Sequence, residues 1–266
     1  MGLAPENRAI RHEAPMLSKR HAEILRILDT QGTVTIAALS EAMGVSSETV
    51  RRDVRPLVEG GAVLRMHGAI SLSTQGGEAP FRRRMRENAV AKQAIAQSVA
   101  ATIAHGDSVM MDTGTTTSFL ARALTRHRRL TVITNSTDVA RTLAGGEGNR
   151  IFLAGGQIIG DSGAVLGAQA IRFVQGYSAA HVVISAGGVE DDEIMDYDEA
   201  EAEFGRALLD RGDRRILATD ATKFGRRGLV TVCGFDRLHV MATDVAPPPR
   251  VAEAMAQAGT ALLLPV

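Results

Sequence analysis

The chain has 266 residues, which is enough for two domains, and its 45% hydrophobic content can build a packed core. Thirty basic residues balance thirty acidic ones, so net charge neither indicates nor excludes a nucleic-acid partner, because a local basic patch can exist within a neutral total. A single cysteine, Cys233, excludes an internal disulfide and a cysteine-cluster zinc site. We therefore expect no metal and no cofactor.

The N-terminal segment, residues 1–16, is polar and lacks the apolar region of a signal peptide. No apolar run in the sequence approaches the roughly 18–20 residues that a membrane-spanning helix needs. We expect a disordered lead-in over residues 1–16, a cytoplasmic location and no membrane partner.

Residues 17–72 have the pattern of three short helices followed by a small hairpin. After a first helix with apolar residues at helical spacing, Thr35 can cap a second helix that ends at Gly44, and Ser46 can cap a third. The pair at 60–61, both glycine, ends the third helix, and the following run AVLRMHGAI alternates like a strand. This order is typical of a winged helix-turn-helix, so we predict a small DNA-binding domain over residues 17–72.

The third helix has a face suited to the major groove of DNA. Val50, Val54 and Leu57 share one side, so the polar side chains point to the outer and flanking arcs. Arginine can bond guanine edges through two hydrogen bonds, and serine or threonine can bond phosphates. The predicted contacts with double-stranded operator DNA are Ser46, Ser47, Thr49, Arg51, Arg52 and Arg55 on the helix, with Arg65 and His67 on the hairpin.

The alternative is a solvated helix whose arginines pair with Glu48, Asp53 and Glu59. The preceding helix, the glycine turn and the basic hairpin favour the DNA-binding interpretation. Pro56 lies inside the helix, where proline costs roughly 3 kcal/mol. We expect a kink or an early helix end near Arg55.

The run from Arg20 to Ala69 resembles the N-terminal domain of DeoR-type bacterial transcriptional repressors. The specific motifs are Val45-Ser46 before Glu48-Thr49-Val50-Arg51-Arg52-Asp53-Val54, and Arg65-Met66-His67-Gly68 in the wing. Order and spacing match over some 50 residues.

Residues 73–80 are small, polar and free of periodicity, which is typical of a linker. Residues 81–266 then alternate short apolar runs with helical segments. The expected strands are 108–112, 130–134, 150–154, 181–185, 214–220 and 237–244; the expected helices include 88–104, 117–124 and 199–210. This alternation predicts an α/β domain with a mostly parallel sheet that is covered on both faces.

The motif DTGTTT at 112–117 joins a predicted strand to a predicted helix, where backbone N–H groups and hydroxyls can bind an anion. The next strand ends similarly in TNS at 134–136, and ligands bind at strand ends in open α/β folds. Ordinary turn and cap chemistry would also explain such loops. The predicted effector contacts here are Asp112, Gly114, Thr115, Thr116, Thr117, Asn135 and Ser136.

Two further candidates come from the second half of the chain. Glu199, in an acidic stretch, could accept hydrogen bonds from polyol hydroxyls, and Lys223 could offer a point charge to a phosphate. The alternatives are a helix start, which favours acidic residues, and a surface charge in a loop.

Phe81, Arg84, the DTGTTT loop and the TKFGR run also resemble the C-terminal effector domain of the same family. The resemblance implies a fold similar to ribose-5-phosphate isomerase and CoA-transferase subunits, and an effector that is a phosphorylated polyol or sugar. The region 200–232 and the tail TDVAPPPRVAEAM are most similar to repressors of glycerol-3-phosphate regulons, which implies glycerol 3-phosphate as effector.

We therefore expect a repressor whose operator binding the effector relieves, and not an enzyme. A homo-oligomer, either a dimer or a tetramer, is expected because one winged helix buries little DNA surface. One alternative is the same repressor with another sugar phosphate as effector. The other is a sugar-phosphate isomerase with an appended DNA-binding domain, in which Asp112, Glu199 and Lys223 act as acid, base and electrostatic clamp.

Overall fold

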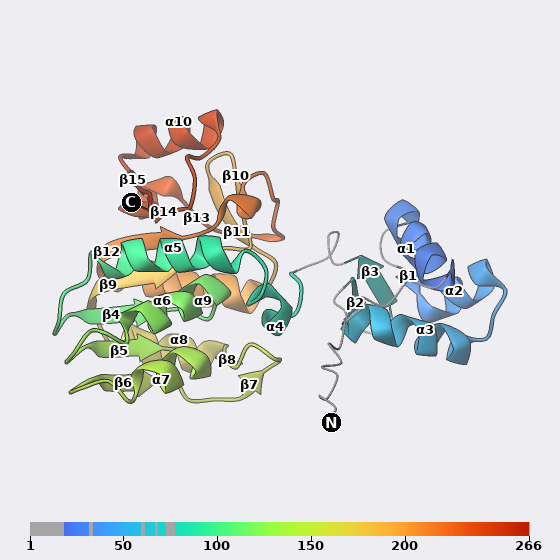
Figure 1. Ribbon diagram of the computed structural model, residues 1–266, viewed down its shortest axis with the longest axis horizontal. Helices are drawn as coiled ribbons and strands as arrows, with labels where there is room; N and C mark the ends of the chain where they lie inside the picture. The colour runs from blue at the N-terminus through green and yellow to red at the C-terminus, as the bar shows by residue number, and fades with distance from the viewer. Residues whose placement is uncertain (1–18, 32–33, 60–61, 67–68, 73–77, 266) are drawn as a thin grey trace, which may run out of the picture. The chain divides into compact units, whose positions relative to one another are not determined.

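The computed structural model describes residues 19–31, 34–59, 62–66, 69–72 and 78–265 (Figure 1). The chain divides into two compact units, Met1–Gly76 and Gly77–Val266. Within the described ranges, every helix is too short or too polar to cross a membrane.

The first unit is a three-helix domain with a small antiparallel sheet. Its helices are α1 (Lys19–Gln31), α2 (Ile36–Met43) and α3 (Ser47–Glu59), and its strands, in spatial order, are β1 (Val34–Thr35), β3 (Ala69–Leu72) and β2 (Val63–Met66). The predicted caps are confirmed: the Thr35 hydroxyl accepts from Ala38 N at 3.1 Å, and that of Ser46 accepts from Thr49 N at 3.2 Å. Gly44 ends α2 in the left-handed conformation, with φ of 64°, which glycine adopts without a Cβ penalty.

The core of this unit brings the three helices and the sheet together. Ile24, Leu39, Val50 and Ile70 are fully buried, and Val54 and Leu57 on α3 join them, as their helical spacing predicted. Of the two effects expected of Pro56, an early end of α3 near Arg55 is wrong, because the helix continues through Pro56 to Glu59, and a kink stays a prediction. Pro56 removes one hydrogen bond in the last turn, where its exposed position lets water replace that bond.

The second unit is built on a seven-stranded parallel sheet, which confirms the predicted fold class. The strands, in spatial order, are β15 (Ala261–Leu263), β14 (Val240–Ala242), β12 (Gly212–Ala218), β9 (Ala179–Ile184), β4 (Ser108–Met111), β5 (Thr131–Thr134) and β6 (Arg150–Leu153). Alternate residues of each strand face opposite layers, so Met110 packs in one core cluster while Val109 and Met111 pack in the other.

Helices cover both faces of this sheet (Figure 1). One face packs α5 (Ala89–Ala100), α6 (Thr115–Leu124) and α7 (Thr137–Leu143); the other packs α8 (Ala168–Gln175), α9 (Glu199–Leu209) and α10 (Pro249–Ala258). The short helix α4 (Phe81–Arg84) precedes them, and 3₁₀ turns lie at η1 (Ala221–Lys223) and η2 (Phe235–Arg237).

The sequence did not predict two smaller sheets in this unit. One is antiparallel and consists of β10 (Gly188–Glu190), β11 (Glu193–Asp196) and β13 (Val230–Gly234); the other is the hairpin of β7 (Ile158–Ile159) and β8 (Ala164–Val165). Their strands have two to five residues, which is too short for a period-2 pattern to stand out.

The strand order reverses between β4 and β9. After β4 the chain adds β5 and β6 on one side, whereas β9 starts the series β12, β14 and β15 on the other. In open α/β sheets, ligands bind in the crevice outside the carboxyl ends of the strands at such a point.

Candidate functional site

The outer face of α3 presents exposed basic side chains with weak local partners. Arg51 Nη1 lies 3.4 Å from Glu48 Oε2, and Arg55 Nε lies 3.5 Å from Glu59 Oε1, with more than half of every one of these side chains exposed. Exposed ion pairs of this kind contribute about 0–1 kcal/mol, so they hold the arginines only loosely.

An open groove beside α3 collects most of the predicted DNA contacts. Its lining includes Ser46, Thr49, Arg51, Arg52, Arg55 and Arg65. Ser47 begins α3, and its side chain is half-buried. His67 lies outside the described residues.

Asp53, by contrast, has a structural role. Arg20 on α1 holds its carboxylate through two hydrogen bonds, of 2.7 Å from Nε and 3.3 Å from Nη2. Asp53 therefore connects α3 to α1, and its carboxylate does not pair with the exposed arginines of α3.

In the second unit, Asp112 lies at the switch point, directly after β4. Its Oδ2 accepts hydrogen bonds from Ser185 N at 2.7 Å and Ser185 Oγ at 3.1 Å, and Ser185 directly follows β9. The buried Oδ1 has no hydrogen-bond partner among the described residues. Burial raises the pKa of Asp112 to about 6, against the opposing effect of the bonds from Ser185.

The rest of the DTGTTT loop is buried and shapes this corner. A Cβ on Gly114 would overlap the Ser185 hydroxyl, so glycine is required for the close approach of the two strand ends. Thr117 Oγ1 donates to the carbonyls of Asp112 and Gly114, at 3.2 and 3.1 Å. Thr115 and Thr116 begin α6 and are each 5% exposed.

The neighbouring strand end contributes Asn135 and Ser136. Asn135 Oδ1 accepts from Thr113 Oγ1 at 3.0 Å, and its Nδ2 donates to Val165 O at 3.1 Å. Ser136 is fully buried and caps α7 by accepting from Val139 N at 3.3 Å. Asn135 thus connects the loop after β4 to β8 through hydrogen bonds, whereas Ser136 stabilises the start of α7.

A small cavity of about 20 Å³ lies against these strand ends, with three acidic side chains around it. Its polar lining is Asp112, Thr113, Asn135, Ser185, Asp196 and Glu201. Burial, reinforced by the charge of Glu78, raises the pKa of Asp196 to about 6. Burial, reinforced by Asp196, raises the pKa of Glu201 to about 8, so this carboxyl is largely protonated at neutral pH.

The predicted contact Glu199 does not reach this cavity. It is exposed at the start of α9, and Glu201, two residues later on the same helix, lines the cavity instead. Asp198 caps the helix by accepting from Ala200 N at 2.8 Å and Glu201 N at 3.1 Å. The helix-start alternative for this acidic stretch therefore fits both Asp198 and Glu199, whereas Asp196 lines the cavity.

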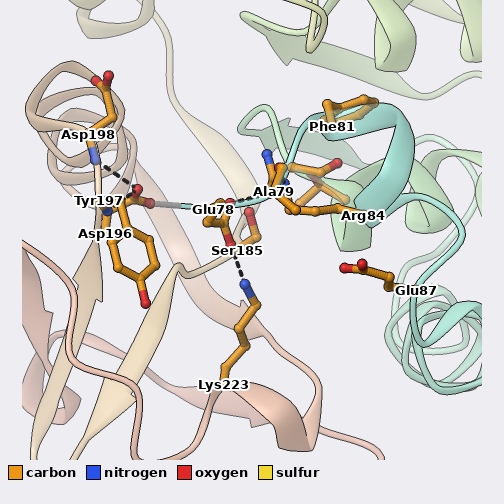
Figure 2. A network of polar contacts seen from close by, with 12 residues as sticks. Glu78, Ala79, Phe81, Arg84, Glu87, Ser185, Asp196, Tyr197, Asp198 and Lys223 are labelled. Atoms are coloured by element: carbon orange, nitrogen blue, oxygen red, sulfur yellow. Dashed lines mark hydrogen bonds and ion pairs between the residues drawn. The ribbon is translucent and has the colours of Figure 1, made fainter. Parts of the chain in front are cut away.

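Lys223 forms an ion pair with Glu78, and the other carboxylate oxygen of Glu78 pairs with Arg84 of α4 (Figure 2). All three side chains are largely buried, with exposed fractions of 13% for Lys223 and Glu78 and 18% for Arg84. Burial alone would raise the pKa of Glu78, but the charges of Arg84 and Lys223 outweigh it and hold that pKa below its usual value.

A third cation, Lys92 of α5, lies close to this pair. Its Nζ donates to the carbonyls of Arg84 and Glu87, at 2.6 and 2.9 Å, and burial lowers its pKa. Asp220, also buried, begins the turn before Lys223 and accepts from Thr222 N at 3.1 Å. Arg84 of α4 and Lys223 of η1 thus hold the Glu78 carboxylate, and the charge of Lys92 on α5 also acts on it.

The two groups of charges lie close enough to act on each other. Glu78 acts electrostatically on Asp112, Asp196 and Glu201, and Arg84 acts on Glu201. In Figure 2, Glu78 lies in the centre, with Lys223 and Arg84 around it and with Ser185 and Asp196 close by. The site thus combines a cationic part with an acidic, hydroxyl-accepting part.

Sequence reasoning missed Glu78, Lys92, Asp196 and Glu201 as site residues. Glu78 lies in a segment whose composition is that of a linker, and composition does not reveal an ion pair. The lysines were a usable signal: the chain has only Lys19, Lys92 and Lys223, and two of these three lie at the site.

Among the described residues, no cluster of three or more His, Cys, Asp and Glu side chains is arranged to hold a metal ion.

Comparison with known proteins identifies both units. The DeoR C-terminal sensor domain matches residues 87–245, and the DeoR-like helix-turn-helix domain matches residues 20–75.

Curated relatives match nearly the whole chain. The glycerol-3-phosphate regulon repressor of Escherichia coli is 30% identical over 90% of this chain and 95% of its own length. The transcriptional repressor CsqR of the same organism is 30% identical over 92% and 95%. AccR, a transcriptional repressor of Agrobacterium fabrum, is 31% identical over 85% and 88%.

Among solved structures, the eIF2B-beta2-delta2 complex of Chaetomium thermophilum aligns with a TM-score of 0.45 and 17% identity, over 82% of this chain and 69% of that one. Ribose-5-phosphate isomerase A of Neisseria gonorrhoeae aligns with a TM-score of 0.35 and 13% identity, over 51% and 53%.

Proposed function

The chain belongs to the DeoR family of transcriptional repressors, and from this membership we propose that it represses transcription until a phosphorylated polyol or sugar binds its sensor domain. Glycerol 3-phosphate is the preferred effector. The support is a relative, 30% identical over 90% of the chain, that is named as the repressor of a glycerol-3-phosphate regulon. DNA binding makes the cytoplasm its place of action.

The winged helix supplies the operator contacts. Arg51, Arg52 and Arg55 are exposed on α3, and Arg65 is exposed on the adjoining strand β2. Arginines on one helix face can read guanine edges in the major groove, while an arginine on the wing can bond the phosphate backbone.

The cationic part of the sensor site would bind the phosphate of the effector. Arg84 and Lys223 already hold an oxyanion, the Glu78 carboxylate, and Lys92 adds a third positive charge nearby. An arginine with two lysines is a usual set of partners for a phosphate group. This pre-assembled anion site is the observation on which the effector proposal depends.

The acidic part would bind the hydroxyl groups. The unpartnered Oδ1 of Asp112 is an acceptor that a ligand hydroxyl can satisfy. Asp196 and Asn135 add further polar atoms on the same cavity, and Glu201, when protonated, can also donate. Acceptors on one side and cations on the other suit a molecule with hydroxyls at one end and a phosphate at the other.

The isomerase alternative has less support. Its three residues, Asp112, Glu199 and Lys223, do not converge, since Glu199 is exposed on α9 and Lys223 is paired with Glu78. The named relatives with this domain pair are repressors.

A homo-oligomer, a dimer or a tetramer, remains part of the proposal. Exposed apolar side chains on the edge strand β6 and the hairpin strand β7 favour it: Leu153 is 40% exposed, Ile158 58% and Ile159 46%. Sedimentation of the full chain would measure the number of subunits.

A thermal-shift panel tests the effector. A ligand at 100 times its Kd adds about 2.7 kcal/mol to the free energy of unfolding, which is a clear shift in midpoint. Glycerol 3-phosphate should give this shift and release a labelled operator fragment, while glycerol should do neither. Turnover of a pentose phosphate that Glu199→Gln abolishes would favour the isomerase instead.

A further inference from the structure

The anion site of the sensor domain is occupied by the protein itself. One carboxylate oxygen of Glu78 pairs with Arg84 and the other pairs with Lys223. Two oxygens of a phosphate group would bind the same two cations in this way. The adjacent cavity measures only about 20 Å³, room for about one water molecule. A three-carbon phosphate is larger than this cavity, and its phosphate group could bind Arg84 and Lys223 only in place of Glu78.

Glu78 is the side chain whose departure makes the site suit an anion. Removing it would leave two buried cations without a carboxylate partner, and breaking one side of a buried pair is strongly unfavourable. An incoming phosphate would restore the balance, because it offers the same oxygens with more negative charge. Conversely, phosphate and Glu78 together would place two anions on the same cations.

We propose that Glu78 is a tethered competitor of the effector: its carboxylate holds the anion site in the free protein, and the effector phosphate displaces it from Arg84 and Lys223. This inference rests on the proposed function for the identity of the ligand. It concerns a residue at the very start of the second unit that is not among the residues lining the cavity.

Glu78 lies where the second unit begins in the sequence. It is the second residue of the unit that begins at Gly77, directly after the unit that ends at Gly76. Arg84 also donates from Nε to Ala79 O at 2.9 Å, so this arginine binds both the side chain of Glu78 and the backbone of the next residue. Displacing the Glu78 carboxylate would therefore remove a side-chain anchor at the start of the second unit and leave the backbone bond at Ala79.

The test compares Glu78→Gln with wild type and with Glu147→Gln, which removes an exposed carboxylate paired with Arg128 on the surface. Calorimetry measures the Kd of glycerol 3-phosphate and of inorganic phosphate, at ionic strength held constant with chloride. Glu78→Gln should bind both more tightly, by about 5- to 150-fold, the range of typical coupling between linked sites. Glu147→Gln should match wild type.

The outcomes separate the two proposals. Equal or weaker binding by Glu78→Gln, with wild type binding normally, overturns the competitor role and makes Glu78 a fixed part of the pocket. If no phosphorylated polyol or sugar binds any of the proteins, the proposed effector class fails, and the inorganic phosphate comparison still tests competition at the cations.

A second measurement uses wild type alone, so it does not depend on the variant folding. Hydrogen exchange of the peptide from Glu78 to Arg84 should become faster when glycerol 3-phosphate saturates the protein. Unchanged or slower exchange would show that the segment stays docked, which overturns the inference.

Discussion

Glu78 and Lys223 are 145 positions apart in the sequence and form a buried ion pair in which each side chain is only 13% exposed. The pair joins the segment after the DNA-binding domain to a turn at the end of strand β12. It places a residue from the start of the second unit at the proposed effector site.

Arg51→Ala should weaken operator binding by about 1–3 kcal/mol and relax sequence preference at one base pair, if this exposed side chain contacts a guanine. Fluorescence anisotropy with operator variants measures both effects. Arg250→Ala removes an exposed arginine of the other unit and is the control. An unchanged footprint with Arg51→Ala would contradict the assignment.

Asp53→Asn should lower the free energy of unfolding of the winged-helix unit by about 1–2 kcal/mol, because it disrupts two hydrogen bonds from Arg20 to a buried carboxylate. Arg20 is half exposed, so water recovers part of the loss. Glu59→Gln, which removes an exposed pair on the same helix, should change stability by less than about 0.5 kcal/mol. Urea denaturation compares them, and equal effects would refute the structural role of Asp53.

Glu201→Gln should be more stable than wild type at high pH. The ordinary pKa of glutamate is 4.5, and burial raises that of Glu201 to about 8. Between these values the unfolded chain has lost the proton that the folded protein keeps, so the wild-type free energy of unfolding falls as pH rises.

The stability difference between Glu201→Gln and wild type should therefore grow from about pH 5 to pH 8, by on the order of 3 kcal/mol. Denaturation at several pH values measures it, with Glu203→Gln, an exposed position on the same helix, as the control. A constant difference across this range would mean that Glu201 is ionised in the folded protein.

Gly114→Ala should destabilise the sensor domain by about 1–3 kcal/mol and weaken effector binding, because the added methyl group overlaps the Ser185 hydroxyl that bonds Asp112. Gly145→Ala is the matched control, since a Cβ there meets no atom within 4 Å. Thermal denaturation and calorimetry read the two effects. Equal stability of both variants would show that the strand ends separate easily.

Local signals predicted much of the fold. Thr35 and Ser46 cap the helices that their positions indicated, and Gly44 ends α2 in the left-handed conformation. The apolar runs became the central strands of a parallel sheet, and the resemblance to the DeoR family is confirmed by the matches to both of its domains. The early end expected for α3 was wrong because proline in the exposed last turn of a helix destabilises it less than proline in the helix interior.

The sequence by itself determined the order of elements and the family, because caps, turns and hydrophobic periodicity depend on neighbours a few residues apart. Only the tertiary structure decided which charges share the sensor site. Asp112 and Lys223 follow two different strands, Asp196 ends a third, and Glu78 precedes them all. Their meeting therefore depends on strand order and on the ion pairs that form once water is excluded. Glu199 and Glu201 differ by two positions on one helix, and packing alone selects the second.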